Sequence, residues 1–222
     1  MAENVADPSG DESGDRYRNA GYEDADVSHP VHVPGGREAV GTLDSPDADR
    51  VVVACPPHPQ YGGSRSDQRL RAVSDALAPE IACLRFDYGE WDGGRGERTD
   101  AENALAWART EFDAVGLFGY SFGADVALRA AAAADGDAPA ALSVLAPPSE
   151  LSDGAAVEAL DTIDCPVQVV YGERDETVEW RPVVDRAREL GHAVESLPAD
   201  HHFVGQADRA AELVSQFFSE RL

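Results

Sequence analysis

Residues 114–134 read AVGLFGYSFGADVALRAAAAA, and this stretch decides the fold. The apolar run 114–118 predicts a buried strand, and the alanine-rich segment 122–134 predicts a helix. Between them, residues 119–123 match G-x-S-x-G, in which a serine occupies a sharp turn from strand to helix. Such a turn would present Ser121 beside the N-terminus of a helix, which favours developing negative charge. The context predicts a nucleophilic serine, whereas the pentapeptide alone would also fit an ordinary glycine-rich turn.

Strand and helix patterns alternate on both sides of this stretch. Apolar residues flanking Pro34-Gly35-Gly36 predict a hairpin first. The later predicted strands are 50–55, 81–86, 114–118, 140–145, 167–171 and 192–197. The predicted helices are 65–78, 100–111, 122–134, 181–190 and 205–220. This alternation predicts an α/β fold: a mostly parallel, twisted sheet of about seven or eight strands with helices on both faces.

The chain is expected to form one domain preceded by a tail. Residues 1–28 contain eight acidic residues and two arginines without sustained apolar periodicity, which predicts a solvated tail without a fixed fold. Residues 29–222 are long enough for one sizeable core. The stretch 146–166 is too short for a large lid.

The charge of the chain is strongly acidic. It holds 42 acidic and 18 basic residues, all of the latter arginine, for a formal net charge of −24. This balance argues against binding to nucleic acid and against docking on anionic lipid, because both need a basic face. The acids are spread along the whole chain, which favours a protein of a high-salt cytoplasm, where salt screens self-repulsion. The alternative is an acidic surface for a cationic partner.

The cysteines and the N-terminus indicate an intracellular protein. Cys55, Cys83 and Cys165 are odd in number and lack C-x-x-C spacing, so they predict buried thiols rather than a disulfide framework or a zinc site. No basic region followed by an apolar stretch marks a secretory signal. No apolar run reaches the roughly 18–20 residues of a membrane helix.

An acid and two histidines follow the serine in the order Ser…Asp…His that the G-x-S-x-G motif predicts. Asp175 follows strand 167–171, and His201 and His202 follow strand 192–197. All would lie at the carboxyl edge of the sheet, where ligands bind in open α/β folds. A serine hydroxyl needs an imidazole to take its proton, and the imidazole needs a carboxylate to fix its tautomer. Glu173 and Glu176 are alternative acids.

Six short motifs together resemble a known family. They are CPPHPQYGG (55–63), RFDYG (85–89), GYSFG (119–123), APP (146–148), GERD (172–175) and DHHF (200–203). This combination resembles the α/β-hydrolases, and among them the small lidless enzymes with a C-H-P-H-P-x-Y-G-G-type loop. The resemblance covers roughly residues 30–222 and is more specific than any one motif.

The resemblance implies roles for individual residues. It makes Ser121 the nucleophile and Asp175 the acid. The family's histidine commonly precedes an aromatic residue, as His202 precedes Phe203, so His202 is expected to complete the triad. His201 is then expected at the rim of the site or on the surface.

The resemblance also implies an oxyanion hole made of the backbone N–H groups of Phe122 and His58. The neighbouring prolines of the loop have no N–H to donate. Pro56 stands where the pattern has its first histidine. No cofactor or metal is implied, and a zinc site from His58, His201 and Asp200 lacks ligand spacing.

These expectations define a serine hydrolase that cleaves a carboxylic ester or related acyl bond in a small-molecule substrate. A thioesterase or peptidase would use the same residues. The alternative from another class is a small-ligand-binding protein without catalysis. The loop 90–97, with Trp91 and three glycines, is expected to border the site, either as a gate for substrate or as a plain connection.

Overall fold

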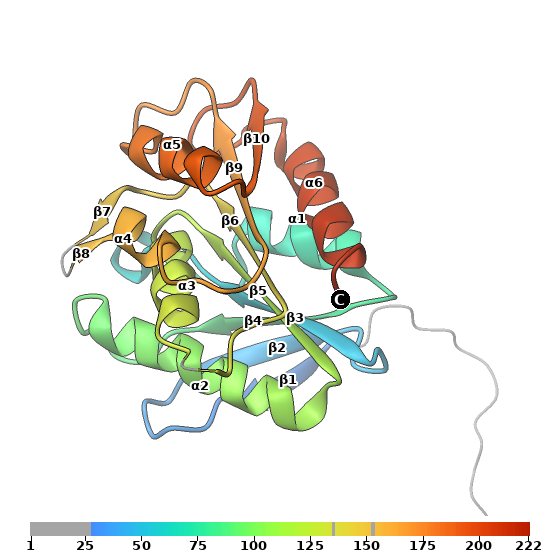
Figure 1. Cartoon of the computed structure of the whole chain (residues 1–222). Coiled ribbons are helices and arrows are strands. Elements are labelled where there is room, and N and C mark those ends of the chain that lie inside the picture. Colours follow the sequence, from blue (N-terminus) through green and yellow to red (C-terminus); the bar gives the residue numbers. More distant parts are fainter. Residues whose placement is uncertain (1–27, 135, 152–153) are drawn as a thin grey trace, which may run out of the picture.

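A central eight-stranded sheet organises the chain in this computed structural model, which describes residues 28–134, 136–151 and 154–222. The order of its strands is β1-β2-β4-β3-β5-β6-β9-β10 (Figure 1). The predicted tail 1–28 lies outside the described residues, except for Ser28.

Most neighbouring strands of this sheet are parallel. The strands are β1 (His29–His32), β2 (Val40–Asp44), β3 (Arg50–Cys55), β4 (Ala82–Asp87), β5 (Ala114–Tyr120), β6 (Ala141–Leu145), β9 (Val167–Gly172) and β10 (Ala193–Leu197). Only the β1–β2 and β2–β4 pairs are antiparallel within this sheet of the described chain. The predictions of a mostly parallel sheet and of an initial hairpin are therefore confirmed.

Helices cover both faces of the sheet, as predicted (Figure 1). One face carries α1 (Gln68–Leu77) and α6 (Ala207–Ser219), whose apolar residues share one core cluster. The other carries α2 (Arg95–Glu111), α3 (Phe122–Ala132), α4 (Ala156–Leu160) and α5 (Arg181–Glu189).

Strand β5 has apolar side chains on both faces of the sheet, and helices bury them on each face. Val115 and Leu117 belong to the core under α2 and α3, whereas Phe118 and Tyr120 belong to the core under α1 and α6. Alternate side chains of a strand point to opposite faces, so a strand buried on both faces is apolar throughout. This burial fixes the end of β5, and with it the turn that begins at Ser121.

The structure adds short elements that the sequence did not predict. These are a 3-10 turn, η1 (Pro59–Tyr61), the small hairpin of β7 (Glu150–Leu151) and β8 (Gly154–Ala155), and α4. In its described part, the segment between β6 and β9 holds only β7, β8 and α4, so no large lid is present there.

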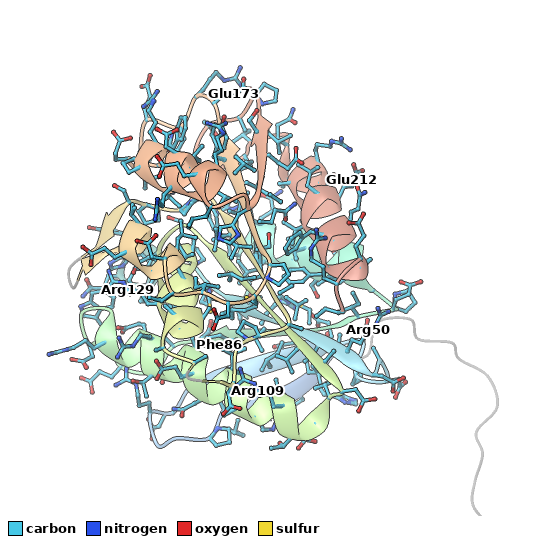
Figure 2. All side chains as sticks on the ribbon, viewed as in Figure 1. Arg50, Phe86, Arg109, Arg129, Glu173 and Glu212 are labelled. Atoms are coloured by element: carbon cyan, nitrogen blue, oxygen red, sulfur yellow. The ribbon has the colours of Figure 1, made fainter. Side chains whose placement is uncertain are left out.

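Buried and exposed side chains separate clearly across this architecture. Phe86 is fully buried, while Glu173 and Glu212 are exposed on the surface (Figure 2).

The three cysteines are free and buried. Burial raises the pKa of the Cys83 thiol to about 12 and that of the Cys165 thiol to about 11. Within the described ranges, no helix combines the length and apolar character needed to cross a bilayer.

Candidate active site

The turn after β5 holds Ser121 in a strained conformation. Its φ and ψ are 56° and −120°, in a region that residues with a side chain rarely adopt. The backbone N–H of Ser121 donates to the carbonyl of Leu145 at 2.9 Å, which ties the turn to β6. A Cβ at Gly119 would clash with the backbone of Gly123, and a Cβ at Gly123 would clash with the carbonyl of Cys55. Both glycines therefore permit the close packing that aims the serine outward.

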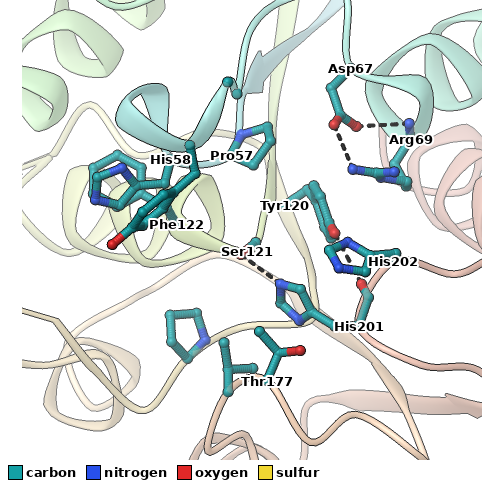
Figure 3. A pocket seen from close by; sticks show the side chains of 15 residues that line it. Pro57, His58, Asp67, Arg69, Tyr120, Ser121, Phe122, Thr177, His201 and His202 are labelled. Carbon is teal, nitrogen blue, oxygen red and sulfur yellow. Dashed lines mark hydrogen bonds and ion pairs between the residues drawn. The ribbon is translucent and has the colours of Figure 1, made fainter.

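A chain of hydrogen bonds connects Ser121 to a histidine and an aspartate. Ser121 Oγ lies 2.9 Å from Nε2 of His201 (Figure 3). Nδ1 of the same ring lies 2.7 Å from Oδ2 of Asp175. If Nδ1 donates to the carboxylate, Nε2 is left as an acceptor for the serine hydroxyl. This is the tautomer with which a histidine can take a proton from serine.

The environment of Asp175 favours its ionised form. Burial by itself would raise the pKa of this carboxyl group. The hydrogen bond from His201 and those from the N–H groups of Thr177 and Val178, at 2.9 and 3.3 Å, outweigh burial and hold the pKa below its ordinary value. Asp175 is thus a buried, negatively charged partner for the imidazole.

The structure contradicts the prediction that His202 partners Ser121. The side chain of His201 is buried and directed at the serine, whereas His202 is exposed at the rim of the pocket. Phe203 occupies the core with a left-handed φ of 52°, and its N–H donates to the carbonyl of Asp200, closing a tight turn. Adjacent side chains in this turn point in different directions, so of the two histidines only His201 faces Ser121.

Two buried aromatic residues fix the backbone on either side of the histidine–aspartate pair. The hydroxyl of Tyr120 donates to the carbonyl of His201 at 3.0 Å. Nε1 of Trp180 donates to the carbonyl of Asp175 at 3.1 Å. The alternative acids lie elsewhere: Glu173 is exposed and accepts a hydrogen bond from Ser196, and Glu176 is exposed.

Ser121 and His201 open into a pocket of about 590 Å³. The lining residues are Pro57, His58, Tyr61, Gly62, Gly63, Asp67, Arg69, Tyr120, Ser121, Phe122, Pro148, Thr177, Val178, His201 and His202. Figure 3 shows His58 and Phe122 on one side of Ser121, and Asp67, Arg69 and His202 on the other. The side chains of Ser121 and His201 are therefore accessible to a small molecule.

The predicted oxyanion residues lie together at this pocket. The rings of His58 and Phe122 are 4.8 Å apart, and both residues line the cavity beside Ser121. The carbonyl of His58 accepts hydrogen bonds from the N–H groups of Tyr61 and Gly63, and its Nδ1 accepts one from Gln60. Partial burial lowers the pKa of the His58 imidazole, against an opposing effect of Glu97, so the ring favours its neutral form.

The residues considered for zinc have separate partners. His58 packs among aromatic rings, His201 bonds Ser121 and Asp175, and Asp200 accepts the N–H of His202 at 3.0 Å. Across the described parts of the chain, no three histidine, cysteine or acidic residues form a group that could hold a metal ion.

Comparisons with known proteins agree with this architecture. The sequence profile of the dienelactone hydrolase family matches residues 92–216. A search of curated protein sequences gave no match.

Three solved structures illustrate the likeness in fold. A lidless α/β serine hydrolase from Xanthomonas campestris has a TM-score of 0.70 and 24% identity, covering 90% of this chain and 97% of that one. A dienelactone hydrolase from Anabaena variabilis has a TM-score of 0.73 and 23% identity, with coverages of 89% and 99%. An esterase from Pyrococcus furiosus has a TM-score of 0.75 and 16% identity, with coverages of 88% and 93%. The predicted α/β-hydrolase fold is thereby confirmed.

Proposed function

Since this chain belongs to the dienelactone hydrolase family, it is a hydrolase, and we propose that it cleaves carboxylic esters through a serine-based acyl-enzyme mechanism. The observation that carries the proposal is the hydrogen-bonded chain from Ser121 through His201 to Asp175, opening into a pocket. The substrate is a small open-chain or cyclic ester.

In the first half-reaction, Nε2 of His201 takes the proton of Ser121 as Oγ attacks the ester carbonyl carbon. Asp175 stabilises the imidazolium that forms. The carbonyl oxygen becomes an oxyanion, which the N–H groups of His58 and Phe122 stabilise. The intermediate then breaks its bond to the alcohol oxygen, which receives the proton from His201, and the acyl group remains on Ser121.

In the second half-reaction, His201 takes a proton from water and the hydroxide attacks the acyl carbon. The bond to Oγ breaks, Ser121 regains its proton from His201, and the carboxylic acid leaves. Removing one oxyanion donor typically costs about 100–1,000-fold in rate, so these two N–H groups account for much of the expected catalysis.

Fluorophosphonate labelling tests the nucleophile directly. The wild-type protein should form one adduct on the peptide containing Ser121, identified by mass spectrometry, while Ser121→Ala should not be labelled. Ser196→Ala is a matched control, because Ser196 is exposed on β10 and donates to Glu173 at 2.9 Å. Folded wild-type protein without an adduct would favour a binding protein on a hydrolase fold.

The salt conditions of the assay follow from the charge. A net charge of −24 suits a high-salt cytoplasm, and we include in the proposal that the protein works there. Hydrolysis and thermal stability should both rise with KCl concentration. An optimum in dilute buffer would refute the assignment to high salt while leaving the proposed ester hydrolysis intact.

The bond that is cleaved can be identified separately. The rates of hydrolysis of an oxygen ester, a thioester and an amide with the same acyl group would distinguish an esterase from a thioesterase or a peptidase.

A further inference from the structure

The segment that follows β4 contacts both residues of the proposed oxyanion hole. The ring of Trp91 lies 4.6 Å from the ring of His58 and 5.6 Å from that of Phe122. Trp91 is not among the residues that line the described pocket. The ring contacts with His58 and Phe122 therefore connect Trp91 to the proposed oxyanion hole.

Tyr88 supplies a second link to the same two places. Its hydroxyl donates to the carbonyl of Pro56 at 3.1 Å, two residues before His58. Its ring meets Phe122 edge-on at 5.8 Å. Tyr88 also stays outside the pocket lining. The loop before His58 and the helix start at Phe122 are thus joined through one neighbouring segment.

Buried carboxylates hold this segment in place. Glu97 has no exposed surface and accepts the N–H groups of Asp92 at 2.9 Å and Gly94 at 2.7 Å. Asp100, also fully buried, accepts the N–H of Gly89 at 2.9 Å and Nε of Arg37 at 2.9 Å. Buried charges are tolerated when they are hydrogen-bonded in this way. These bonds favour a fixed connection over a gate in the loop 90–97.

We propose that Trp91 and Tyr88 are positioning residues that fix the N–H groups of His58 and Phe122 for the oxyanion. An oxyanion hole is effective because its donors are oriented before charge develops. A displacement of about 1 Å by a remote change can cost about 100-fold in rate. The inference rests on the proposed function, since it assigns a role within that reaction.

The test compares ester hydrolysis by Trp91→Ala, Trp91→Phe and Tyr88→Phe with the wild type. Trp91→Ala should lower kcat about 10–100-fold with KM within about threefold, because Trp91 lies outside the lining of the pocket. Trp91→Phe keeps a ring against His58 and should recover most of the rate. Tyr88→Phe loses one hydrogen bond and should show a smaller fall in kcat.

Two further readouts separate positioning from general damage. A trifluoromethyl ketone, whose adduct with serine carries an oxyanion, should lose affinity for Trp91→Ala by the same factor as kcat/KM. The midpoint of the pH–rate profile should stay unchanged, because the Ser121–His201 pair is untouched. Trp107→Ala is the matched control: Trp107 is a half-buried tryptophan on α2 that packs on Phe112 at 6.2 Å.

The outcomes are distinct. A wild-type kcat and inhibitor affinity in Trp91→Ala would overturn the inference, as would equal losses in Trp91→Ala and Trp107→Ala. If Trp91→Ala does not fold, a wild-type kcat together with wild-type inhibitor affinity in Tyr88→Phe would overturn it. Wild-type protein without hydrolysis dependent on Ser121 would instead refute the proposed function itself.

Discussion

Separate alanine substitutions of His201 and His202 are expected to affect ester hydrolysis very unequally. Nε2 of His201 lies 2.9 Å from Ser121 Oγ, and its Nδ1 bonds a buried carboxylate. His202 is exposed, and its ring contact in the described chain is with His201, at 5.4 Å between centroids. His201→Ala removes the proposed base, whereas His202→Ala removes part of the pocket rim.

The magnitude follows from these contacts. Loss of the base in a serine triad costs about 10⁴–10⁶-fold in kcat, or about 5–8 kcal/mol in the barrier at 1.36 kcal/mol per tenfold. His202→Ala removes an exposed ring that bonds neither Ser121 nor Asp175, so its expected loss is below about threefold, or about 0.7 kcal/mol.

The assay is kcat/KM for a short-chain nitrophenyl ester in molar KCl, with thermal unfolding to verify that both variants fold. The rate of fluorophosphonate labelling at Ser121 gives an independent measure of nucleophile activation. A loss of activity in His202→Ala equal to or larger than that in His201→Ala would refute the reasoning.

Three other perturbations have defined outcomes. Asp175→Asn should lower kcat about 10⁴-fold, since an amide N–H facing Nδ1 of His201 leaves the proton on Nε2, which then cannot accept from serine; activity near wild type would contradict this tautomer argument. Gly123→Ala places a Cβ against the carbonyl at the end of β3 and should destabilise the fold by about 1–3 kcal/mol, measured by urea unfolding; an unchanged midpoint would show that the contact relaxes freely. Burial acts to raise the pKa of Asp44, but hydrogen bonds, including one from Arg85 at 2.6 Å, hold it below the ordinary value of 3.8. The resulting stabilisation is present above pH 3.8 and is lost as the pH falls through the pKa of Asp44 in the folded state. Asp44→Asn should therefore weaken the decrease in the free energy of unfolding at acidic pH. The same pH dependence in wild type and variant would rule out this linkage.

The elements around the serine could be predicted because local sequence determines them. Residues 114–120 are apolar throughout, as burial on both faces of a sheet requires, and the following glycines mark the turn. Helix α2 is the counterexample: it begins at Arg95, before the predicted residue 100. Its first turn is polar, and the capping by Glu97 is a contact that apolar periodicity does not reveal.

The choice between the adjacent histidines could not be made from local sequence. It depends on a turn whose end is set by the burial of Phe203, and on the bond from Tyr120 to the carbonyl of His201 across 81 positions of the chain. The aromatic residue after His202 suggested the wrong neighbour. The Asp200–Phe203 turn was visible as a motif, but its rotation relative to Ser121 is a tertiary property.

The three buried thiols can report local unfolding of the protein. Burial raises the pKa of all three cysteines, and a protonated, inaccessible thiol does not react with an alkylating reagent. Cys55 ends β3, Cys83 lies in β4 and Cys165 precedes β9, so each samples a different part of the sheet. The rate at which an added alkylating reagent modifies each cysteine therefore measures how often that part of the protein exposes its interior, without any engineered label.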